Sequence, residues 1–501
     1  MFNTDVWKWR SRSYDFGSGV FGLDFDKTLQ KYHPGVTLMW LGTVGVKFYN
    51  LYLDVSKSGI TPDSIQAVFG LHTTQKFLVV LAIGISLGFA FIASRRLIDT
   101  RYAYLALLLL ILEPFFMAHT RTFHLEGLES TFMLVSTLWF YYWLQETENK
   151  KRLFIASFFT ALAFLTKTTS LYLLPFFGLY LFFDSLKKDK RFIFALGRSF
   201  KLWFIWLFPA LLFVFLLWPA LWVDPVGVIQ YLGKGVFEVG IDTDHQQFYF
   251  GKLVDNPGPL YYLVVLLFRS SPYLLVGLIG SFFVKKTKFI YFLLSYAFFY
   301  LVMITIPSKK LDRYILPSMT SMVLLSTYFY VWCLDKLKLK SLTVIVLFFI
   351  LPVATAFCLH PDYLSYYNPM LGGLRTGMYV LEPKWMIGQG EIIKYFKNVQ
   401  KTDNLEPSWD QSFENVNKHS SVKNILTVGF QEKYYTQIWP FFREFGAWAV
   451  IKDLTPFAKN TMYFVYPVWN DDSNLEDRFK LEFVTTIKIR GVNVYNVYKR
   501  S

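Results

Sequence analysis

The most regular feature of this chain is a succession of apolar stretches separated by short polar connections. Ten such stretches lie near 78–94, 102–118, 128–144, 153–165, 169–183, 202–220, 259–284, 289–306, 314–333 and 341–358. Most have the length of about 17–20 residues that an α-helix needs to cross a bilayer. The stretches 153–165 and 169–183 are shorter, so a tilted or partly re-entrant course stays open for them. The pattern predicts an α-helical polytopic membrane protein with about ten transmembrane helices.

Basic residues gather in every second connection. These five groups are Arg95, Arg96 and Arg101; Lys150, Lys151 and Arg152; Lys187, Lys188, Lys190 and Arg191; Lys285, Lys286 and Lys288; and Lys336, Lys338 and Lys340. The positive-inside rule assigns them to the cytoplasm. The extracytoplasmic side then receives residues 1–77, 119–127, 166–168, 221–258, 307–313 and everything after 359. Both ends of the chain are therefore predicted to lie outside.

Composition supports a multi-pass protein of the plasma membrane. Of the 501 residues, 54% are hydrophobic and 20% are aromatic, which excludes a soluble globular class. The net charge of +15 comes largely from the basic connections, and no nucleic-acid motif accompanies it. We therefore expect the protein to lie among membrane lipids and not to bind nucleic acid. Cys333 lies at the cytoplasmic end of one predicted span and Cys358 at the outer end of the next, about a membrane thickness apart, so no disulfide is expected to join them.

The first extracytoplasmic segment, 1–77, is predicted to carry interfacial helices. Residues 37–53 form an apolar helix with aromatic anchors such as Trp40 and Phe48, which favours a position at the interface. The alternative, a further span at 37–53, would invert the side of every later basic connection. Residues 1–36 contain no secretory apolar region. A basic loop is not easily exported as a bare N-terminus, so we expect an eleventh span upstream of Met1.

Ionisable residues recur in the predicted extracytoplasmic connections. Arg121, His124 and Glu126 precede one span, and an acid this close to a hydrocarbon core usually has a partner or a task. An alternative is that Arg121 and Glu126 simply pair to close a helix end. Lys167 lies in a tight turn, where the alternative is a lysine that snorkels to the interface.

Three cations, Lys309, Lys310 and Arg313, stand at the mouth of one span and predict an anion site for a phosphate or pyrophosphate. Acids beside cations on one membrane face suit sugar transfer from a lipid phosphate. A carboxylate takes the proton of the acceptor hydroxyl, and cations stabilise the leaving phosphate. A transporter for an anionic substrate has a similar composition. The candidates for substrate binding are His33, Arg121, His124 and His245.

Seven short motifs resemble those of a known family. They are Asp5 with Trp9, Arg12 and Ser13; Tyr32-His33-Pro34-Gly35-Val36-Thr37; His124-Leu125-Glu126; Leu165-Thr166-Lys167; Trp218-Pro219-Ala220-Leu221-Trp222; Asp255-Asn256-Pro257-Gly258-Pro259; and Lys310-Leu311-Asp312-Arg313-Tyr314. Each motif is weak alone, but seven in order are specific. From Asp5 to about Gly390 the sequence is similar to bacterial members of the dolichyl-phosphate-mannose protein mannosyltransferase family, the GT39 group of the GT-C glycosyltransferase superfamily.

The resemblance implies an integral-membrane glycosyltransferase that moves a monosaccharide from a polyprenyl-phosphate donor to an acceptor hydroxyl with inversion. It implies that Asp5 is the catalytic base, although relatives often carry a second acid where this chain has Val6. Glu126 matches an acid that would organise the site together with His124. By the same resemblance Lys167, Lys310 and Arg313 would face the donor phosphate. Such families also have one more span at the N-terminus.

No metal or other cofactor is predicted. The outer histidines His33, His119, His124 and His245 show none of the HxxxH or HExxH spacings that commonly bind zinc. A lone histidine more often makes an ordinary hydrogen bond.

After the predicted transmembrane domain, 78–358, residues 359–501 are predicted to form a small extracytoplasmic α/β domain. Helices are expected at 390–398 and 433–443, a flexible excursion at 402–422, and strands at 424–429, 447–451, 461–467, 482–489 and 492–498. Arg490-Gly491 between the last two strands predicts a hairpin. The domain carries no recognisable catalytic motif, so acceptor binding and scaffolding both fit.

Two other functions stay open. A flippase or anion carrier would favour charges within the spans, which here are nearly free of them apart from Glu113. A structural component of an envelope assembly would use the outer domain for docking. The sequence names neither the sugar nor the acceptor, for which protein, glycan and lipid hydroxyls all fit.

Overall fold

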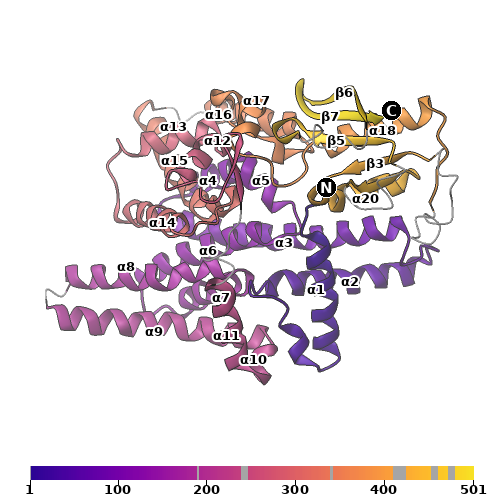
Figure 1. Ribbon diagram of the computed structural model, residues 1–501. Coiled ribbons are helices and arrows are strands. Elements are labelled where there is room, and N and C mark those ends of the chain that lie inside the picture. Colours follow the sequence, from indigo (N-terminus) through magenta and orange to yellow (C-terminus); the bar gives the residue numbers. More distant parts are fainter. Residues whose placement is uncertain are drawn as a thin grey trace.

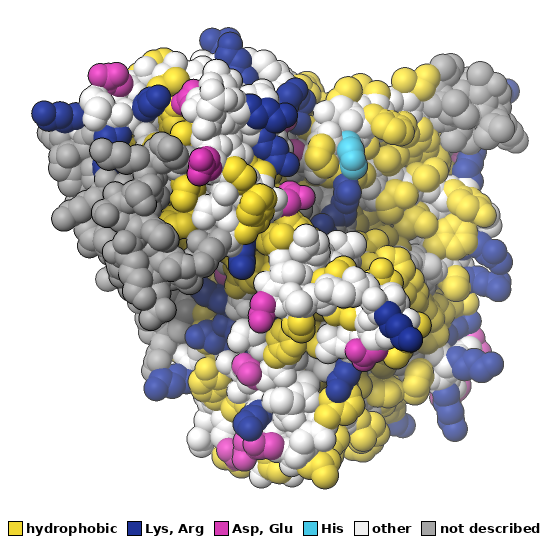
Figure 2. Space-filling model, turned by 90° about the vertical axis from the view of Figure 1, so that its right-hand side faces the viewer, with side chains coloured by type: hydrophobic (Ala, Val, Ile, Leu, Met, Phe, Trp, Pro, Cys, Tyr) yellow, Lys and Arg dark blue, Asp and Glu magenta, His cyan; other side chains and the backbone are white. Residues whose placement is uncertain are grey.

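The computed structural model describes residues 2–188, 191–237, 246–338, 342–409, 425–452, 461–471 and 480–501. Long helices form a bundle, and a smaller mixed sheet with its own helices lies beside one end of it (Figure 1). The N-terminus lies next to the helices of this smaller part. On the face shown in Figure 2, hydrophobic side chains lie beside Lys and Arg side chains, and the surface is hollowed between them.

The bundle consists of apolar helices, some of which are capped at the first turn by a polar side chain. The helices are α3 (Ile65–Leu97), α4 (Thr100–Leu112), α5 (Pro114–Thr120), α6 (Leu125–Leu144), α7 (Lys150–Thr166), α8 (Leu173–Lys188), α9 (Phe192–Leu217), α12 (Tyr261–Arg269), α13 (Pro272–Ser281), α14 (Lys288–Thr305), α15 (Leu316–Lys336) and α16 (Leu342–Leu359). Ser64, Asp99 and Asn149 each accept a hydrogen bond from the backbone N–H three residues further on. Such caps satisfy N–H groups that a helix leaves unpaired at its start.

The prediction of about ten spans is confirmed only in part. Within the described ranges, five helices are long and apolar enough to cross a membrane: 65–97, 168–188, 192–217, 288–305 and 312–336. A sixth span results if α4 and α5, which are bent by 71° at their junction, are counted together. The protein is therefore a helical polytopic membrane protein with fewer straight spans than its apolar pattern suggests.

Proline explains two of the differences. The stretch predicted as one helix at 259–284 is two helices, because Pro272 opens α13 after a break at Ser270 and Ser271. Pro114 opens α5 in the same way. Proline has no N–H for the preceding turn, and its ring favours the first position of a new helix.

Charged residues inside the apolar stretches form contacts that stabilise these helix breaks. Glu113 is fully buried at the bend and accepts hydrogen bonds from the backbone N–H and the hydroxyl of Ser271, at 2.9 and 2.5 Å. The apolar stretch predicted at 259–284 contains a further charged residue, Arg269. Arg269 is buried at the end of α12, where its Nε donates to Asp312 Oδ2 at 3.0 Å and its Nη1 donates to two backbone carbonyls.

Helix α6 forms the centre of the bundle. Every residue from Leu125 to Tyr141 is buried, including the acids Glu126 and Glu129 near the start of the helix. Helix α9 buries few of its residues and exposes large side chains such as Phe204 and Phe208, which suits a lipid-facing position. The residues at the start of α6 are thus held rigidly on all sides.

The N-terminal segment wraps around one end of this centre. It contains α1 (Val6–Phe21), a 3-10 turn at Phe25–Thr28 and α2 (Val36–Ser56). Gly35, with φ +60°, lets the chain approach α7 closely: its N–H donates to Thr166 O at 3.1 Å, and the Trp9 ring lies where a Cβ would stand. Helix α2, predicted to lie at the interface, is not among the six candidate spans.

Shorter elements connect the bundle helices. After α7 comes the 3-10 helix η2 (Thr168–Tyr172). After α9 come α10 (Ala220–Val223), α11 (Pro225–Lys234) and the hairpin strands β1 (Gln247–Tyr249) and β2 (Lys252–Val254). The 3-10 helix η4 (Asp312–Ile315) precedes α15, and α17 (Gly373–Val380) follows the bundle.

The C-terminal part is a mixed sheet with helices. Its elements are α18 (Gln389–Thr402), β3 (Thr427–Phe430), α20 (Glu432–Glu444), β4 (Trp448–Ile451), β5 (Tyr463–Pro467), β6 (Leu481–Ile489) and β7 (Val492–Arg500). The strand order is β4-β3-β5-β7-β6, with β3 parallel to β4 and β5, and β7 antiparallel to β5 and β6. The predicted strands, both helices and the hairpin at Arg490 and Gly491 are confirmed to within a few residues. Most of the predicted excursion at 402–422 falls outside the described residues.

The first residues of the chain are held by this C-terminal part. Trp7 Nε1 donates to Thr436 O at 2.6 Å, and Gln389 Nε2 donates to Phe2 O at 3.1 Å. Gln437 Nε2 donates to Thr4 Oγ1 at 3.0 Å. These bonds fix the residues around Asp5 between the sheet part and the bundle.

Candidate functional site

Asp5 stands at the start of α1 and faces the loop before α6. Its backbone N–H donates to Asn3 Oδ1 at 2.9 Å. Its side chain is 30% exposed, and Oδ2 lies 3.1 Å from Nε2 of His124. Asp5 thus combines a fixed backbone with a carboxylate that still reaches solvent.

His124 joins two carboxylates. Its backbone is extended, with φ −155°, just before α6, and its Nδ1 is hydrogen bonded to Glu126. Burial lowers the pKa of His124, but the negative charges of Glu126 and Asp5 outweigh burial, so the pKa is raised. Burial raises the pKa of Asp5, but the hydrogen bond and charge of His124 and the charge of Arg313 lower it to about 2. The arrangement favours an imidazolium between two carboxylates.

Glu126 connects this pair to two cations. Its Oε1 accepts from Arg313 Nε at 2.8 Å and lies 3.4 Å from Lys167 Nζ. Lys167 is only 3% exposed and lies 3.5 Å from Glu129 Oε2. Three segments that are far apart in the sequence therefore meet at Glu126, and His124 joins a fourth, which holds Asp5, to them.

The geometry fits neither alternative considered for Arg121 and Lys167, which were an Arg121–Glu126 pair that closes a helix end and a Lys167 that snorkels to the interface. Arg121 does not pair with Glu126, because its guanidinium lies 4.8 Å from the centre of the Tyr363 ring. Lys167 does not snorkel, because its ammonium is buried between two carboxylates and lies 4.1 Å from the centre of the Tyr314 ring.

The two neighbouring lysines before α15 differ in their contacts. Lys310 Nζ donates to Asn256 Oδ1 at 3.0 Å and to Pro307 O at 2.6 Å, so this side chain holds its own loop. Lys309 is partly exposed and has no hydrogen-bond or ion-pair partner among the residues that the structure describes. Burial and the charges of Arg313 and Lys167 lower the pKa of Lys309. Lys309 is therefore the cation with room for an anion.

Two predicted histidines have different outcomes. His33 Nδ1 is 3.1 Å from Thr168 Oγ1, next to Lys167, and burial and the charge of Lys167 lower its pKa to about 3. A neutral His33 thus lies at the edge of the site. His245 lies outside the described residues.

Sequence reasoning did not assign a role to two residues of the site. Glu129 accepts a hydrogen bond from Thr169 Oγ1 and lies beside Lys167. Its position three residues after Glu126 puts both acids on one helix face, which was a usable signal. Trp385 has its ring 5.0 Å from that of His124 and 5.3 Å from the Arg313 guanidinium. No pattern marked Trp385, because its contacts depend on the path of the chain after the bundle.

Apolar cavities approach the site along α14. One, of about 600 Å³, lies between α8 and α14, and the other, of about 400 Å³, lies between α12 and α14. Both include Val302 and Ile306, which come shortly before Lys309 in the chain. No group of three or more His, Cys, Asp or Glu side chains in the described part of the chain is arranged to hold a metal ion.

Comparison with known proteins finds a family match in one part of the chain. The sequence model of the family described as dolichyl-phosphate-mannose-protein mannosyltransferase matches residues 65–222. Over residues 65–222 the chain is therefore similar to this glycosyltransferase family. The matched segment of the glycosyltransferase contains Arg121, His124, Glu126 and Lys167. No curated protein sequence matches the chain.

Two solved structures are similar to this glycosyltransferase at low identity. The crystal structure of ArnT from Cupriavidus metallidurans bound to undecaprenyl phosphate has 12% identity and a TM-score of 0.44, covering 97% of this chain and 92% of that chain. The oligosaccharyltransferase AglB from Archaeoglobus fulgidus, in complex with an inhibitory peptide and a dolichol-phosphate, has 13% identity and a TM-score of 0.43, covering 100% and 71%.

Proposed function

We propose that this glycosyltransferase takes a monosaccharide from a polyprenyl-phosphate donor and transfers it, with inversion, to an acceptor hydroxyl on the extracytoplasmic face. The observation that carries the proposal is the continuous set of contacts from Asp5 through His124 and Glu126 to Arg313. It joins a solvent-accessible carboxylate to cations. A base for the acceptor and a counter-charge for a leaving phosphate are the two groups that this reaction requires.

Asp5 is the base in this proposal. In the described contacts only its Oδ2 is engaged, by His124, so Oδ1 is available to an acceptor hydroxyl. The hydroxyl proton passes to Asp5 while the hydroxyl oxygen bonds to the anomeric carbon. The bond from that carbon to the phosphate oxygen breaks, and its electron pair leaves with the polyprenyl phosphate. A single displacement of this kind inverts the anomeric configuration.

Glu126 acts as a positioning residue. It is 3% exposed, and its oxygens are occupied by His124, Arg313 and Lys167, so it is neither a second base nor a nucleophile. It holds His124 against Asp5 and Arg313 near the leaving group. Asp5 therefore acts alone, which fits the Val6 beside it.

The donor phosphate is assigned to Arg313 and Lys309. Arg313 uses Nε for Glu126, which leaves the two terminal nitrogens of its planar group for phosphate oxygens. Lys309 supplies a second charge. Lys167 is buried, so it acts on the phosphate only through the electrostatic field of its charge. Lys310 supports its own loop.

The lipid part of the donor is assigned to the apolar cavities along α14. Val302 and Ile306 line both cavities and precede Lys309, so a polyprenyl chain lying there would bring its phosphate towards the cations. The family description names a dolichyl-phosphate-linked sugar, which is a donor of this chemical class. From the same family match we infer the GT-C architecture. From the basic connections we infer that the active site lies on the extracytoplasmic side.

The contacts of Glu113 do not favour a carrier. This acid binds Ser271 at a helix break, so its charge has a structural partner instead of a transport pathway. We therefore propose no second function.

A reconstitution assay tests the proposal. The purified full-length chain is incubated in liposomes with a polyprenyl-phosphate hexose carrying a labelled sugar, and with extracted envelope glycoconjugates, proteins and lipids as acceptors. We expect label on an acceptor from the lipid donor and none from the corresponding nucleotide sugar. Movement of the lipid across the bilayer without transfer would contradict the proposal in favour of a carrier, and absence of both in favour of an assembly component.

A further inference from the structure

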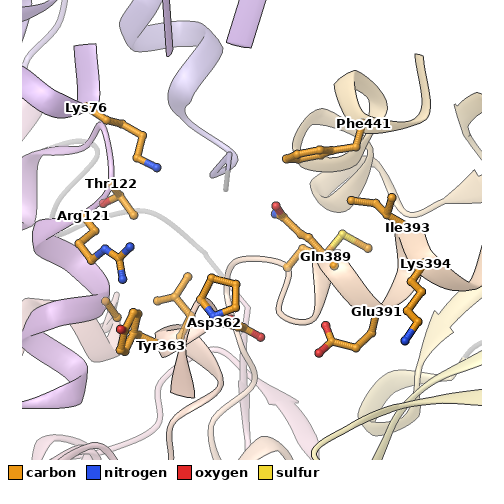
Figure 3. A pocket seen from close by; sticks show the side chains of 15 residues that line it. Lys76, Arg121, Thr122, Asp362, Tyr363, Gln389, Glu391, Ile393, Lys394 and Phe441 are labelled. Atoms are coloured by element: carbon orange, nitrogen blue, oxygen red, sulfur yellow. The ribbon is translucent and has the colours of Figure 1, made fainter. Parts of the chain in front are cut away.

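Another cavity, with several charged residues in its lining, adjoins the segments that hold Asp5. It has a volume of about 450 Å³ and is bounded by α3, the loop after α5, residues 361–364, α18 and α20. Figure 3 shows Lys76 and Arg121 on one side of it, with Gln389 and Glu391 on the other. Its size suits a small-molecule ligand of one or two sugar units.

The cavity and the candidate active site share their supporting chain. Gln389, which lines the cavity, donates to the backbone carbonyl of Phe2, three residues before Asp5. Arg121 and Thr122 line the cavity and come just before His124, the partner of Asp5. A ligand bound here therefore lies against the same two segments that hold the base.

Two cations of this cavity, Lys76 and Arg121, have no acidic partner among the residues that the structure describes. Lys76 makes no hydrogen bond or ion pair with any residue in the described ranges, and Arg121 only stacks on Tyr363. Nearby cations are paired: Lys384 and Lys433 bind Glu382 at 2.7 and 3.1 Å. Glu391 lies on the other side of the cavity, so an anion placed between these two positive charges would be stabilised by both of them.

The cavity lining also offers unpaired acceptors. Asp362 Oδ1 and Gln389 Oε1 are buried and have no hydrogen-bond partner, and Gln389 is 8% exposed. The other oxygen of Asp362 accepts from Gly388 N–H at 2.7 Å. Buried acceptors of this kind are usually satisfied, so a ligand with several hydroxyl donors is their natural complement. Figure 3 shows Gln389 extending into the space between the walls and Phe441 beside it.

We propose that this cavity binds the acceptor and that the acceptor is an anionic glycan. Its hydroxyls donate to Asp362 and Gln389, and its carboxylate or phosphate substituent pairs with Lys76 and Arg121. A serine or threonine hydroxyl on a neutral peptide supplies neither the several donors nor the charge. This inference rests on the proposed function, because it names the substrate that Asp5 deprotonates.

Equilibrium binding to the purified full-length chain, without donor, tests the inference. The probes are a neutral disaccharide, the same disaccharide with one uronic acid, the same disaccharide with one phosphate, and a neutral serine- and threonine-containing peptide. We expect at least one anionic disaccharide to bind about tenfold or more tightly than the neutral one, with added salt weakening that binding. The better of the two identifies the anionic group.

Matched variants locate the binding. Lys76→Gln breaks no contact in the described structure, so it is expected to fold normally and to weaken anionic binding about tenfold, down to that of the neutral disaccharide. Arg121→Gln should act in the same direction. Lys8→Gln, at an exposed position of α1 that does not line the cavity, is the control and should change nothing.

Two results would overturn the inference: equal binding of the neutral disaccharide or the peptide, or anionic binding that Lys76→Gln and Arg121→Gln both leave unchanged. The two proposals fail separately. Binding as expected, with no transfer from any polyprenyl-phosphate sugar, contradicts only the proposed function. Transfer to a peptide or neutral glycan, without anionic binding, contradicts only this inference.

Discussion

Lys309 and Lys310 carry the same charge on adjacent residues but have different contacts. Lys310 is tied to Asn256 and Pro307, whereas Lys309 has no partner in the part of the chain that the structure describes. The account therefore assigns donor phosphate binding to Lys309 and loop stability to Lys310. Variants of these two adjacent lysines therefore compare donor binding with loop stability directly.

We predict that Lys309→Gln raises the donor KM about tenfold and leaves Tm unchanged, because it removes a charge but no contact. Lys310→Gln should lower Tm and change the donor KM less. Both constants are measured with purified protein at saturating acceptor. A larger rise of the donor KM in Lys310→Gln than in Lys309→Gln would contradict the assignment.

The pH dependence of stability tests the pair His124 and Asp5. Because the folded state raises the pKa of His124 above 6.5, its charge stabilises the fold fully below pH 6.5, and this contribution disappears as the pH rises through the raised pKa. The Tm difference between the wild type and His124→Gln should therefore be largest near pH 5–6 and shrink at alkaline pH.

For His33 we expect a pH dependence of stability with the opposite sign. Its pKa is lowered to about 3 in the folded state. Between pH 6.5 and pH 3, His33 therefore binds a proton in the unfolded chain but not in the folded chain. The wild type should lose stability relative to His33→Gln as the pH falls from 6.5 to 5. Thermal unfolding across pH 5–9 measures both variants, and parallel curves for the two would contradict the assigned charge states.

At the residue scale, the sequence predicted which residues meet but not how they pair. Motif positions and the side of each connection brought Asp5, His124, Glu126, Lys167 and Arg313 to one site, and the structure brings these five together. The direction of a side chain in a loop depends on contacts distant in sequence. For that reason Lys309 and Lys310 were not distinguishable, and Trp385 was not found.

The bend between α4 and α5 and the break between α12 and α13 form one structural unit. Glu113 accepts two hydrogen bonds from Ser271, the cap of α13, which itself binds Leu274 N–H at 3.2 Å. The side chain thus satisfies donors that the two breaks leave unpaired. Such donors are costly when buried.

We predict that Glu113→Ala lowers stability by about 1–3 kcal/mol for each buried group left unpaired. Glu113→Gln keeps one acceptor oxygen and should retain most stability and transfer activity. Thermal unfolding and the transfer assay measure these effects, with Glu148→Gln, an exposed acid without a shared helix break, as the control. If Glu113→Gln abolishes transfer while its Tm is unchanged, the charge itself has a task.

At the element scale, local patterns predicted the C-terminal part better than the bundle. Alternating apolar residues and the turn at Arg490-Gly491, where φ is +48° and +81°, define strands whose faces are fixed by a period of two. In an apolar stretch every helical register buries hydrophobic surface, so hydropathy does not mark interruptions. Pro114 and Pro272 were the only local signs of the breaks.

The whole molecule brings one end of the bundle, the N-terminal helices and the sheet part together around Asp5. The predicted side of that end depends on the five basic connections. The same argument assigned the ionisable residues to one face before any contact was known. Sidedness therefore deserves a direct test.

We predict that Ser58→Cys and Lys401→Cys, in a variant without Cys333 and Cys358, react with a membrane-impermeant maleimide on intact cells. Lys188→Cys should react only after permeabilisation, because its connection is basic and cytoplasmic. All three positions are exposed. Labelling of Lys188→Cys on intact cells would invert the topology and with it the side of the active site.

The central claim is that Asp5 is the base of sugar transfer from a lipid phosphate. The most direct measurement is the single-turnover rate of transfer from a labelled polyprenyl-phosphate sugar by wild type, Asp5→Asn and Asp15→Asn, an exposed change on the same helix. We predict that Asp5→Asn lowers the rate about 10²–10⁴-fold with donor binding retained, and that Asp15→Asn does not. An undiminished rate in Asp5→Asn would contradict the account.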